Sequence, residues 1–252
     1  MLTLITIPIS HYCEKARWAL DRAGIPYREK RHIQGVHQIA ARRAGGGKTV
    51  PVLITPDGVL AESADILAWV DERTPEAMRL RPADPEGEAL CRRFDDVLGP
   101  HGRRLMYVHV LKDKDFVLSF NNAGVPRWED RAMRAGWPVV KRFAARELDI
   151  TPGIERQDEA TVWREFDFAA ELLSDGRAYL SGDRFSAADL TFAALAAPIV
   201  VPPEYTVALP QPDADAPPEP RALIERAREH PAGAHALKMF RQHRREHAAV
   251  LG

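Results

Sequence analysis

The sequence predicts two domains, a small mixed α/β domain over residues 1–76 and an all-helical domain over residues 86–252. Strand and helix patterns alternate in the first third of the chain, whereas only helix and loop patterns follow. A stretch with two prolines at 79–85 separates the two parts, so residues 77–85 are expected to be a linker. A length of 252 residues suffices for two hydrophobic cores.

The composition is that of a soluble globular protein, with 45% apolar and 28% charged residues. The net charge of -1 provides no global field toward nucleic acid or an anionic membrane. Two cysteines are too few for a disulfide scaffold and suit a reducing compartment. The apolar start, 1–9, lacks a basic leader, and the near-apolar run 190–201 is too short to span a bilayer. We therefore expect a cytoplasmic protein that binds neither nucleic acid nor membrane.

The first domain begins with a short, apolar, β-branched segment at 2–7 that suits a buried strand. Apolar residues at helical spacing follow Ser10, and Gly24 ends that helix. Residues 27–32 are extended but polar, which predicts an edge strand. The remaining patterns predict a weak helix at 35–43, a glycine break at 45–47, strands at 50–55 and 59–61 and a helix at 64–73.

The second domain is expected to consist of helices and loops. The predicted helices are 86–111 with a kink at Gly99–Pro100, 127–147 with a bend at 136–138, 155–173, an apolar helix after Ser186, 221–229 and 233–250. Ser186 and Asp189 form a short capping box, which typically stabilises a helix by about 1 kcal/mol. The proline-rich stretch 202–220, with an acidic segment at 213–216, is expected to be a loop.

Four motifs, in this order and spacing, make the chain resemble the glutathione transferase superfamily, nearest to its Ser-type classes. They are Ser-His-Tyr-Cys-Glu-Lys-Ala-Arg at 10–17, Lys-Thr-Val-Pro-Val-Leu at 48–53, Glu-Ser at 62–63 and Ser-Ala-Ala-Asp-Leu at 186–190. The resemblance implies a thioredoxin-like α/β N-terminal domain and an all-α C-terminal domain. The chain departs from the pattern at His11, where many members have proline, and in its long loop near the C-terminus.

The resemblance also implies that glutathione is the cosubstrate, that no metal is needed and that Ser10 is the catalytic residue. Lowering a thiol pKa from about 8.5 to about 6.5 requires roughly 2.7 kcal/mol. A hydroxyl hydrogen bond to an ion contributes about 1.5–3 kcal/mol, and a helix N-terminus about 0.3–1 kcal/mol. Ser10 at the head of a helix can supply both. The alternative is that Ser10 only caps the helix.

Cys13 stands where a Cys-x-x-Cys redox protein has its second cysteine, but Ser10 occupies the first position, so no disulfide can form there. Cys13 is therefore either a helix residue packed inward or the nucleophile of a thiol-exchange reaction. Tyr12 and His11 are further candidate donors to the sulfur. Arg17, one turn into the helix, is expected to be structural.

The resemblance implies that the remaining motifs bind the ends of glutathione. A cis bond before Pro51 would let the backbone of Val50 pair with the extended peptide. Glu62 suits the ammonium group of the γ-glutamyl end and Ser63 its carboxylate, and Lys48 suits the glycine carboxylate. The alternatives are a trans proline at a strand start, a solvated lysine and a serine that is a plain N-cap.

The helical domain is expected to shape the pocket for a small hydrophobic electrophile around Leu105, Met106 and Tyr107. The main interpretation is a glutathione transferase that activates the thiolate for attack on this electrophile, and the superfamily implies a homodimer. The alternatives are glutathione-dependent isomerisation, dehalogenation or ether cleavage, thiol exchange through Cys13, and a non-catalytic glutathione-binding module.

Two other motifs are rejected. Ala-Gly-Gly-Gly-Lys-Thr at 44–49 is similar to a phosphate-binding loop, but Arg42 occupies the first required glycine position and a strand follows. His-Arg-Arg-Glu-His at 243–247 matches a zinc-peptidase pattern, but it lies five residues from the end and is better explained as a solvated basic helix end. Neither nucleotide binding nor a metal site is therefore expected.

Overall fold

The computed structural model describes residues 1–81, 85–213, 217–244 and 249–251. The centre of the predicted linker, most of the acidic loop segment and the glutamate and second histidine of the rejected zinc pattern lie outside the described residues. The chain divides into two compact units. The first contains Met1–Met78, Asp113–Asp149 and the last strand, and the second contains Arg79–Lys112 and Ile150–Arg244. The segment 113–149, assigned from the sequence to the helical domain, thus groups with the first unit, and the predicted domain limits stay a prediction.

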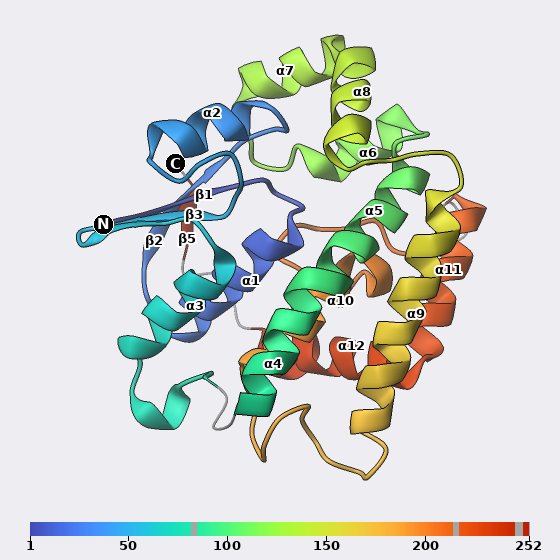
Figure 1. Ribbon diagram of the computed structural model, residues 1–252. Helices are drawn as coiled ribbons and strands as arrows, with labels where there is room; N and C mark the ends of the chain where they lie inside the picture. Colours follow the sequence, from blue (N-terminus) through green and yellow to red (C-terminus); the bar gives the residue numbers. More distant parts are fainter. Residues whose placement is uncertain (82–84, 214–216, 245–248, 252) are drawn as a thin grey trace. The chain divides into compact units, whose positions relative to one another are not determined.

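The first unit is built on a five-stranded sheet in the order β4-β3-β1-β2-β5 (Figure 1). β1 runs parallel to β2 and antiparallel to β3, which forms a hairpin with β4. The strands are β1 (Leu2–Thr6), β2 (Tyr27–Arg31), β3 (Val52–Thr55), β4 (Gly58–Leu60) and β5 (Ala249–Leu251).

Helices cover both faces of this sheet. α1 (His11–Arg22) and α3 (Ser63–Glu72) pack together, and α2 (Val36–Arg43) lies on the opposite face (Figure 1). Ala41 of α2 packs on Ile5 and Val52. The thioredoxin-like α/β arrangement expected for the first part of the chain is confirmed, as is the helical remainder.

The predictions of an edge strand at 27–32 and of a last helix at 233–250 are wrong, and one strand pairing explains both errors. β2 is not an edge strand, because β5 pairs with it in parallel, from Tyr27–Ala249 to Glu29–Leu251. The last helix, predicted as 233–250, ends at His243. The chain then supplies β5 to the first unit. The polar sequence of β2 reflects buried charge rather than an open edge.

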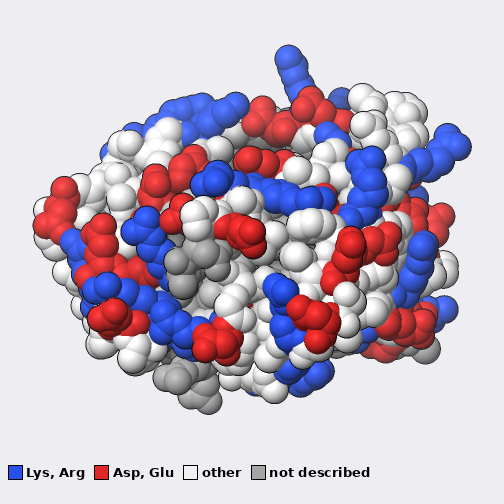
Figure 2. All heavy atoms as spheres, turned by 60° about the horizontal axis from the view of Figure 1, so that its bottom comes forward, with Lys and Arg blue, Asp and Glu red and all other residues white. Residues whose placement is uncertain are grey.

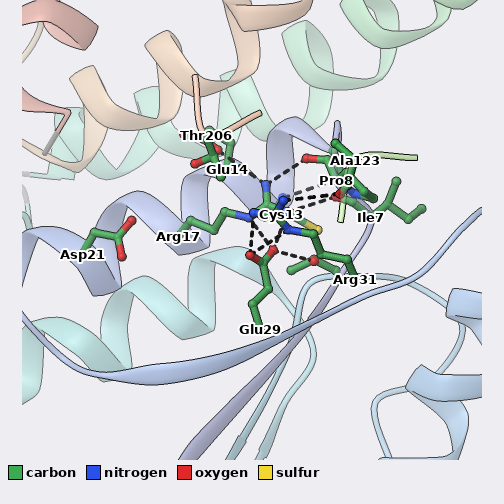
Figure 3. A network of polar contacts seen from close by, with 12 residues as sticks. Ile7, Pro8, Cys13, Glu14, Arg17, Asp21, Glu29, Arg31, Ala123 and Thr206 are labelled. Atoms are coloured by element: carbon green, nitrogen blue, oxygen red, sulfur yellow. Dashed lines mark hydrogen bonds and ion pairs between the residues drawn. The ribbon is translucent and has the colours of Figure 1, made fainter. Parts of the chain in front are cut away.

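Glu29 is the buried charge of β2, and its side chain is fully enclosed (Figure 3). Its Oε1 accepts hydrogen bonds from the Thr6 hydroxyl and Arg17 Nε, both at 2.7 Å, and its Oε2 accepts one from Arg31 Nε at 2.9 Å. Burial opposes ionisation, but the Arg17 and Arg31 guanidinium groups lower the pKa of this carboxyl to about 2. Glu29 is therefore charged in the folded protein.

Three further helices belong to the first unit: α6 (Lys114–Asn121), α7 (Arg127–Ala135) and α8 (Trp137–Glu147). The bend predicted at 136–138 is a complete break between α7 and α8. Pro138 has no N–H for the α-helical pattern, and the amide of Gly136 bonds back to Ala132 O at 2.8 Å. The single helix predicted for 127–147 is thus two helices.

The second unit is helical. Its helices are α4 (Pro85–Arg93), α5 (Gly99–Val110), α9 (Ile154–Leu172), α10 (Ala187–Val200), α11 (Pro218–Glu229) and α12 (Pro231–His243). A π-helical segment, Phe94–Leu98, joins α4 to α5 and makes the irregularity predicted near Gly99–Pro100. Pro100 cannot donate a backbone hydrogen bond, and the Gly99 amide reaches back five residues to Phe94 O.

α10 is the centre of the second unit. All of its residues except Pro198 are buried, and it contacts α4, α5, α11 and α12. The Phe192 ring lies 5.0 Å from Phe94 and 5.8 Å from Phe166, measured between ring centroids. The predicted capping box at the start of α10 is confirmed.

The Asp189 carboxylate of this capping box is fully buried, and it accepts more hydrogen bonds than the one that the capping box requires. It accepts hydrogen bonds from the Ser186 amide at 3.1 Å, the Ser186 hydroxyl at 3.0 Å and the Leu180 amide at 2.8 Å. His235 Nε2 lies 3.1 Å from the same carboxylate. Asp189 thereby joins α10, α12 and the preceding loop.

On the face drawn in Figure 2, acidic and basic side chains are interspersed, and neither sign forms a continuous area. This distribution matches the net charge of -1. Within the described residues, no helix is both long enough and apolar enough to cross a membrane.

Asp189→Ala is expected to lower the free energy of unfolding by about 2–4 kcal/mol, because it leaves several buried donors without an acceptor. Urea unfolding followed by circular dichroism measures the effect. The exposed Asp183→Ala is the matched control and should change the free energy by less than about 0.5 kcal/mol. Equal losses in the two variants would contradict the role given to Asp189.

Stability is expected to fall as the pH drops through the titration range of Glu29. Its pKa is lowered from 4.5 to about 2 by folding, so its contribution is complete above pH 4.5 and is lost toward pH 2. The lowered pKa corresponds to about 3 kcal/mol. Urea unfolding between pH 5 and 2 should show this dependence in the wild type and a weaker one in Glu29→Gln. An equal slope in both proteins would be the contrary result.

Candidate functional site

Ser10 stands at the turn between β1 and α1. It is the N-cap residue of α1, with extended backbone angles, and its Oγ accepts the Cys13 amide at 3.3 Å. The side chain is half-buried. Because the oxygen accepts this bond, the hydroxyl hydrogen can point toward an anion beside the helix start. Capping and donation to a sulfur are thus compatible roles for one hydroxyl.

Arg17 holds the turn that carries Ser10. Its guanidinium is fully buried, with Nη1 3.1 Å from Pro8 O and Nη2 3.2 Å from Ile7 O (Figure 3). Its Nε donates to Glu29 on β2 at 2.7 Å. The structural role expected for Arg17 is confirmed, and the buried cation fixes the two carbonyls that precede Ser10.

The other three candidates at the start of α1 are placed differently. Cys13 is fully buried, and burial raises the pKa of its thiol, although Arg17 and the Ser10 side chain act in the opposite direction. His11 is also buried, and its ring lies 4.5 Å from the half-buried Tyr12 ring. Cys13 therefore has neither the exposure nor the low pKa of a reactive thiol.

The segment before β3 has the expected backbone. The Val50–Pro51 peptide bond is cis, as predicted. Val50 is half-buried and lies outside the pairing of β1 with β3, which begins at Ile5–Val52. Lys48 is exposed. The main chain of Val50 thus lies beyond the end of the strand pairing, where an extended peptide can pair with it.

The start of α3 differs from the interpretation of Ser63 as a plain N-cap residue. Glu62 is the N-cap residue, and Ser63 is the first residue of the helix, so a plain N-cap role for Ser63 is wrong. The side chain of the N-cap residue Glu62 makes no hydrogen bond to the first turn of α3. Glu62 is exposed and Ser63 is 5% exposed. The first amides of α3 are therefore suited to a carboxylate supplied from outside.

The strand register brings these three segments to one end of the sheet. Ile5 near the end of β1 pairs with Val52 at the start of β3, and Leu53 pairs with Leu60 at the end of β4. The turn after β1, the segment before β3 and the start of α3 therefore meet at this end, which we call the site end. The predicted residues at the site end are Ser10, His11, Tyr12, Cys13, Lys48, Val50, Pro51, Glu62 and Ser63.

The residues predicted for the electrophile pocket belong to the second unit. Leu105 and Met106 of α5 are buried, at 1% and 8% exposure, and Tyr107 is half-buried. α5 packs against α9 and α10. The structure therefore groups the glutathione candidates in one unit and the electrophile candidates in the other.

Sequence reasoning missed Glu29 and Arg31, which support the turn through Arg17. The signal was the alternation in β2, where Tyr27 and Glu29 are buried whereas Arg28 and Lys30 are exposed. This two-residue alternation indicates that Glu29 faces inward, and a buried carboxylate is stable only when a cation or hydrogen-bond donors pair with it. Among the described residues, no group of three or more His, Cys, Asp or Glu side chains is arranged to hold a metal ion.

Comparison with known proteins gives matches by sequence family and by structure. Residues 4–78 match the family of the glutathione S-transferase N-terminal domain. No curated protein matches the chain by sequence.

Three crystal structures of glutathione S-transferases share the fold. The enzyme from Ceriporiopsis subvermispora, in complex with glutathione, has a TM-score of 0.61 and 18% identity and covers 97% of this chain and 98% of its own. The enzyme from Methylobacillus flagellatus, with glutathione bound, has a TM-score of 0.59 and 16% identity. The match covers 94% of this chain and 93% of that enzyme. The enzyme from Methylobacterium radiotolerans, in complex with glutathione sulfonate, has a TM-score of 0.53 and 22% identity, and the match covers 94% of each chain.

The family match covers the part of the first unit that contains the site end, and the structural matches extend over both units. Residues 4–78 therefore match the glutathione S-transferase N-terminal domain, and the chain as a whole shares the fold of the glutathione S-transferases.

Proposed function

We propose that the first unit binds glutathione and that Ser10 stabilises its thiolate for attack on a small hydrophobic electrophile. The observation that carries the proposal is the Ser10 hydroxyl at the N-terminus of α1, at the same end of the sheet as Val50 and Ser63. Similar folds with glutathione or glutathione sulfonate bound support it.

Each part of the tripeptide has a candidate partner at the site end. The backbone of Val50 pairs with the cysteinyl main chain. Ser63 and the first amides of α3 receive the γ-glutamyl carboxylate, and Glu62 receives the ammonium group. The exposed Lys48 neutralises the glycine carboxylate.

The reaction needs an anionic sulfur. The thiol proton leaves to solvent, and the Ser10 hydroxyl donates to the thiolate while its oxygen keeps the Cys13 amide. The sulfur attacks the electrophilic carbon, a C–S bond forms, and the leaving group departs with its electron pair. A hydrogen bond of about 1.5–3 kcal/mol and a helix N-terminus of about 0.3–1 kcal/mol together match the roughly 2.7 kcal/mol that a pKa near 6.5 requires.

The burial of Cys13 and the raised pKa of its thiol weigh against thiol exchange through this residue. Isomerisation, dehalogenation and ether cleavage use the same thiolate, so they are variants of the proposal that differ in substrate. Of the residues proposed to contact the electrophile, the half-buried Tyr107 stays the candidate, whereas the burial of Leu105 and Met106 suits packing inside the second unit. A homodimer in the cytoplasm completes the proposal, and sedimentation velocity tests the dimer.

Ser10→Ala is expected to leave folding intact and to lower the rate of conjugation by at least about tenfold, equivalent to about 1.4 kcal/mol, because the thiolate loses its donor. The assay is turnover of a chlorinated aromatic substrate with saturating glutathione. Cys13→Ala is the control and should stay within about twofold of the wild type.

Unchanged conjugation in Ser10→Ala would remove Ser10 from its role. Retention on immobilised glutathione without turnover of a broad electrophile panel would favour a non-catalytic binding module. Exchange with a mixed disulfide that disappears in Cys13→Ala would favour the thiol-exchange alternative.

Glu62→Gln and Ser63→Ala are each expected to weaken glutathione binding by about tenfold, because each removes a partner of the charged γ-glutamyl end. The rate at saturating glutathione should change little, since these contacts are equally strong in ground and transition states. Titration calorimetry measures the affinity. Glu72→Gln, at the other end of α3 and exposed, is the matched control. An effect of the same size in Glu72→Gln would contradict this assignment.

A further inference from the structure

The segment 113–149 contacts the rest of the first unit at the connection between β2 and α2, residues 32–35. This connection lies at the site end, because Thr6 at the end of β1 pairs with Arg31 at the end of the parallel strand β2. The His32 amide also donates to Thr6 O at 2.9 Å, next to the turn that carries Ser10. A segment from the middle of the chain therefore reaches the end of the sheet where glutathione is proposed to bind.

Glu129 of α7 makes the central contact. Its side chain is fully buried, its Oε2 accepts the Ile33 amide at 2.9 Å, and its Oε1 lies 2.8 Å from His32 Nδ1. A buried carboxylate is costly unless its oxygens receive hydrogen bonds. Both of these partners lie on the connection, so Glu129 fixes its backbone and a side chain at once.

Two further contacts flank Glu129. The side-chain amides of Gln34 and Asn121 form a reciprocal pair, at 2.7 and 3.0 Å. Arg31 Nη1 donates to Ala123 O at 3.3 Å, while Arg31 Nε holds Glu29. The connection is thus bound on both sides of His32 and Ile33 by 113–149.

The connection leads directly into α2 and then into the binding segment. The Gly46 amide bonds to Ala41 O at 2.9 Å, which ties the loop after α2 to the helix. Ala41 packs on Ile5 and Val52, at the start of β3. Val50 packs against the same cluster, so contacts link α2 to the 48–50 segment, which contains Lys48 and Val50.

We propose that Glu129 is a positioning residue for glutathione binding. It holds the 32–35 connection, and through α2 the 48–50 segment, in the conformation that receives the tripeptide backbone. The inference rests on the proposed function, which it deepens by adding a residue that does not touch the ligand. Pre-organisation of this kind raises affinity because the binding segment is ordered before the ligand arrives.

The test compares Glu129→Ala with the wild type in two measurements. Hydrogen exchange followed by mass spectrometry reports the order of 32–44 without any ligand, and titration calorimetry with reduced glutathione reports affinity. We expect faster exchange over 32–44 and a dissociation constant raised at least about tenfold in Glu129→Ala. The turnover rate at saturating glutathione should remain within about twofold, because the loss is one of binding alone.

Three variants accompany the test. Glu129→Gln keeps an oxygen for the Ile33 amide, and its side-chain N–H can donate to His32 Nδ1 once the ring takes the tautomer protonated at Nε2, so affinity should return to within about threefold of the wild type. Glu147→Ala is the control, because its bond to Gln38 at 3.3 Å is exposed, and it should change neither measurement. If Glu129→Ala does not fold, Gln34→Ala breaks the amide pair and should still weaken binding, by about threefold.

The outcomes separate this inference from the proposed function. Wild-type protein that binds glutathione, with unchanged affinity in Glu129→Ala and Gln34→Ala, overturns the positioning role and leaves the proposed function intact. Faster exchange with unchanged affinity overturns it as well, since the contact is then only structural. Wild-type protein that takes up no glutathione overturns both.

Discussion

The buried ion pair between Arg17 and Glu29 is the interaction on which the site depends. Both side chains are fully enclosed, and their contact at 2.7 Å joins α1 to β2. Removing two charges from water is costly, and removing one partner of such a pair typically costs about 3–5 kcal/mol. Arg17 also donates to the carbonyl oxygens of Ile7 and Pro8, so the pair fixes the backbone before Ser10. The position of a half-buried hydroxyl is thus set by charges that solvent does not reach.

The same network connects the site to the rest of the first unit. Glu29 binds Arg31, and Arg31 reaches Ala123 in the segment between α6 and α7. Sheet register brings the turn after β1, the start of β3, the start of α3 and the β2–α2 connection to the same end. Elements distant in sequence therefore meet at one end of the sheet.

Much of the fold could be predicted from the sequence because local signals agree with it. The observed elements agree with four local signals: the spacing of hydrophobic residues, Gly24 after α1, the capping box of α10 and the order of strand and helix patterns. The site residues could be proposed because they lie at the ends of strands and helices, and those ends can be located from local patterns.

The missed features depend on contacts between distant segments. β5 pairs with β2 across most of the chain length, and the helical pattern of 233–250 carries no sign of that pairing. Docking of 113–149 on the β2–α2 connection depends on Glu129, which reads locally as a surface residue of a charged helix. The alternation of residues in β2 does indicate that Glu29 faces inward. The cation that pairs with Glu29, Arg17, lies 12 positions away on a different element, so the pair cannot be identified from the local pattern. Tertiary pairing of charges is the information that local patterns lack.

The central claim is that the sulfur of bound glutathione is held as an anion beside the start of α1. An ultraviolet titration of thiolate absorbance in the glutathione complex tests it most directly. The account predicts an apparent thiol pKa near about 6.5 for the bound tripeptide, against about 8.5 in solution. A bound thiol that titrates near 8.5 would contradict it.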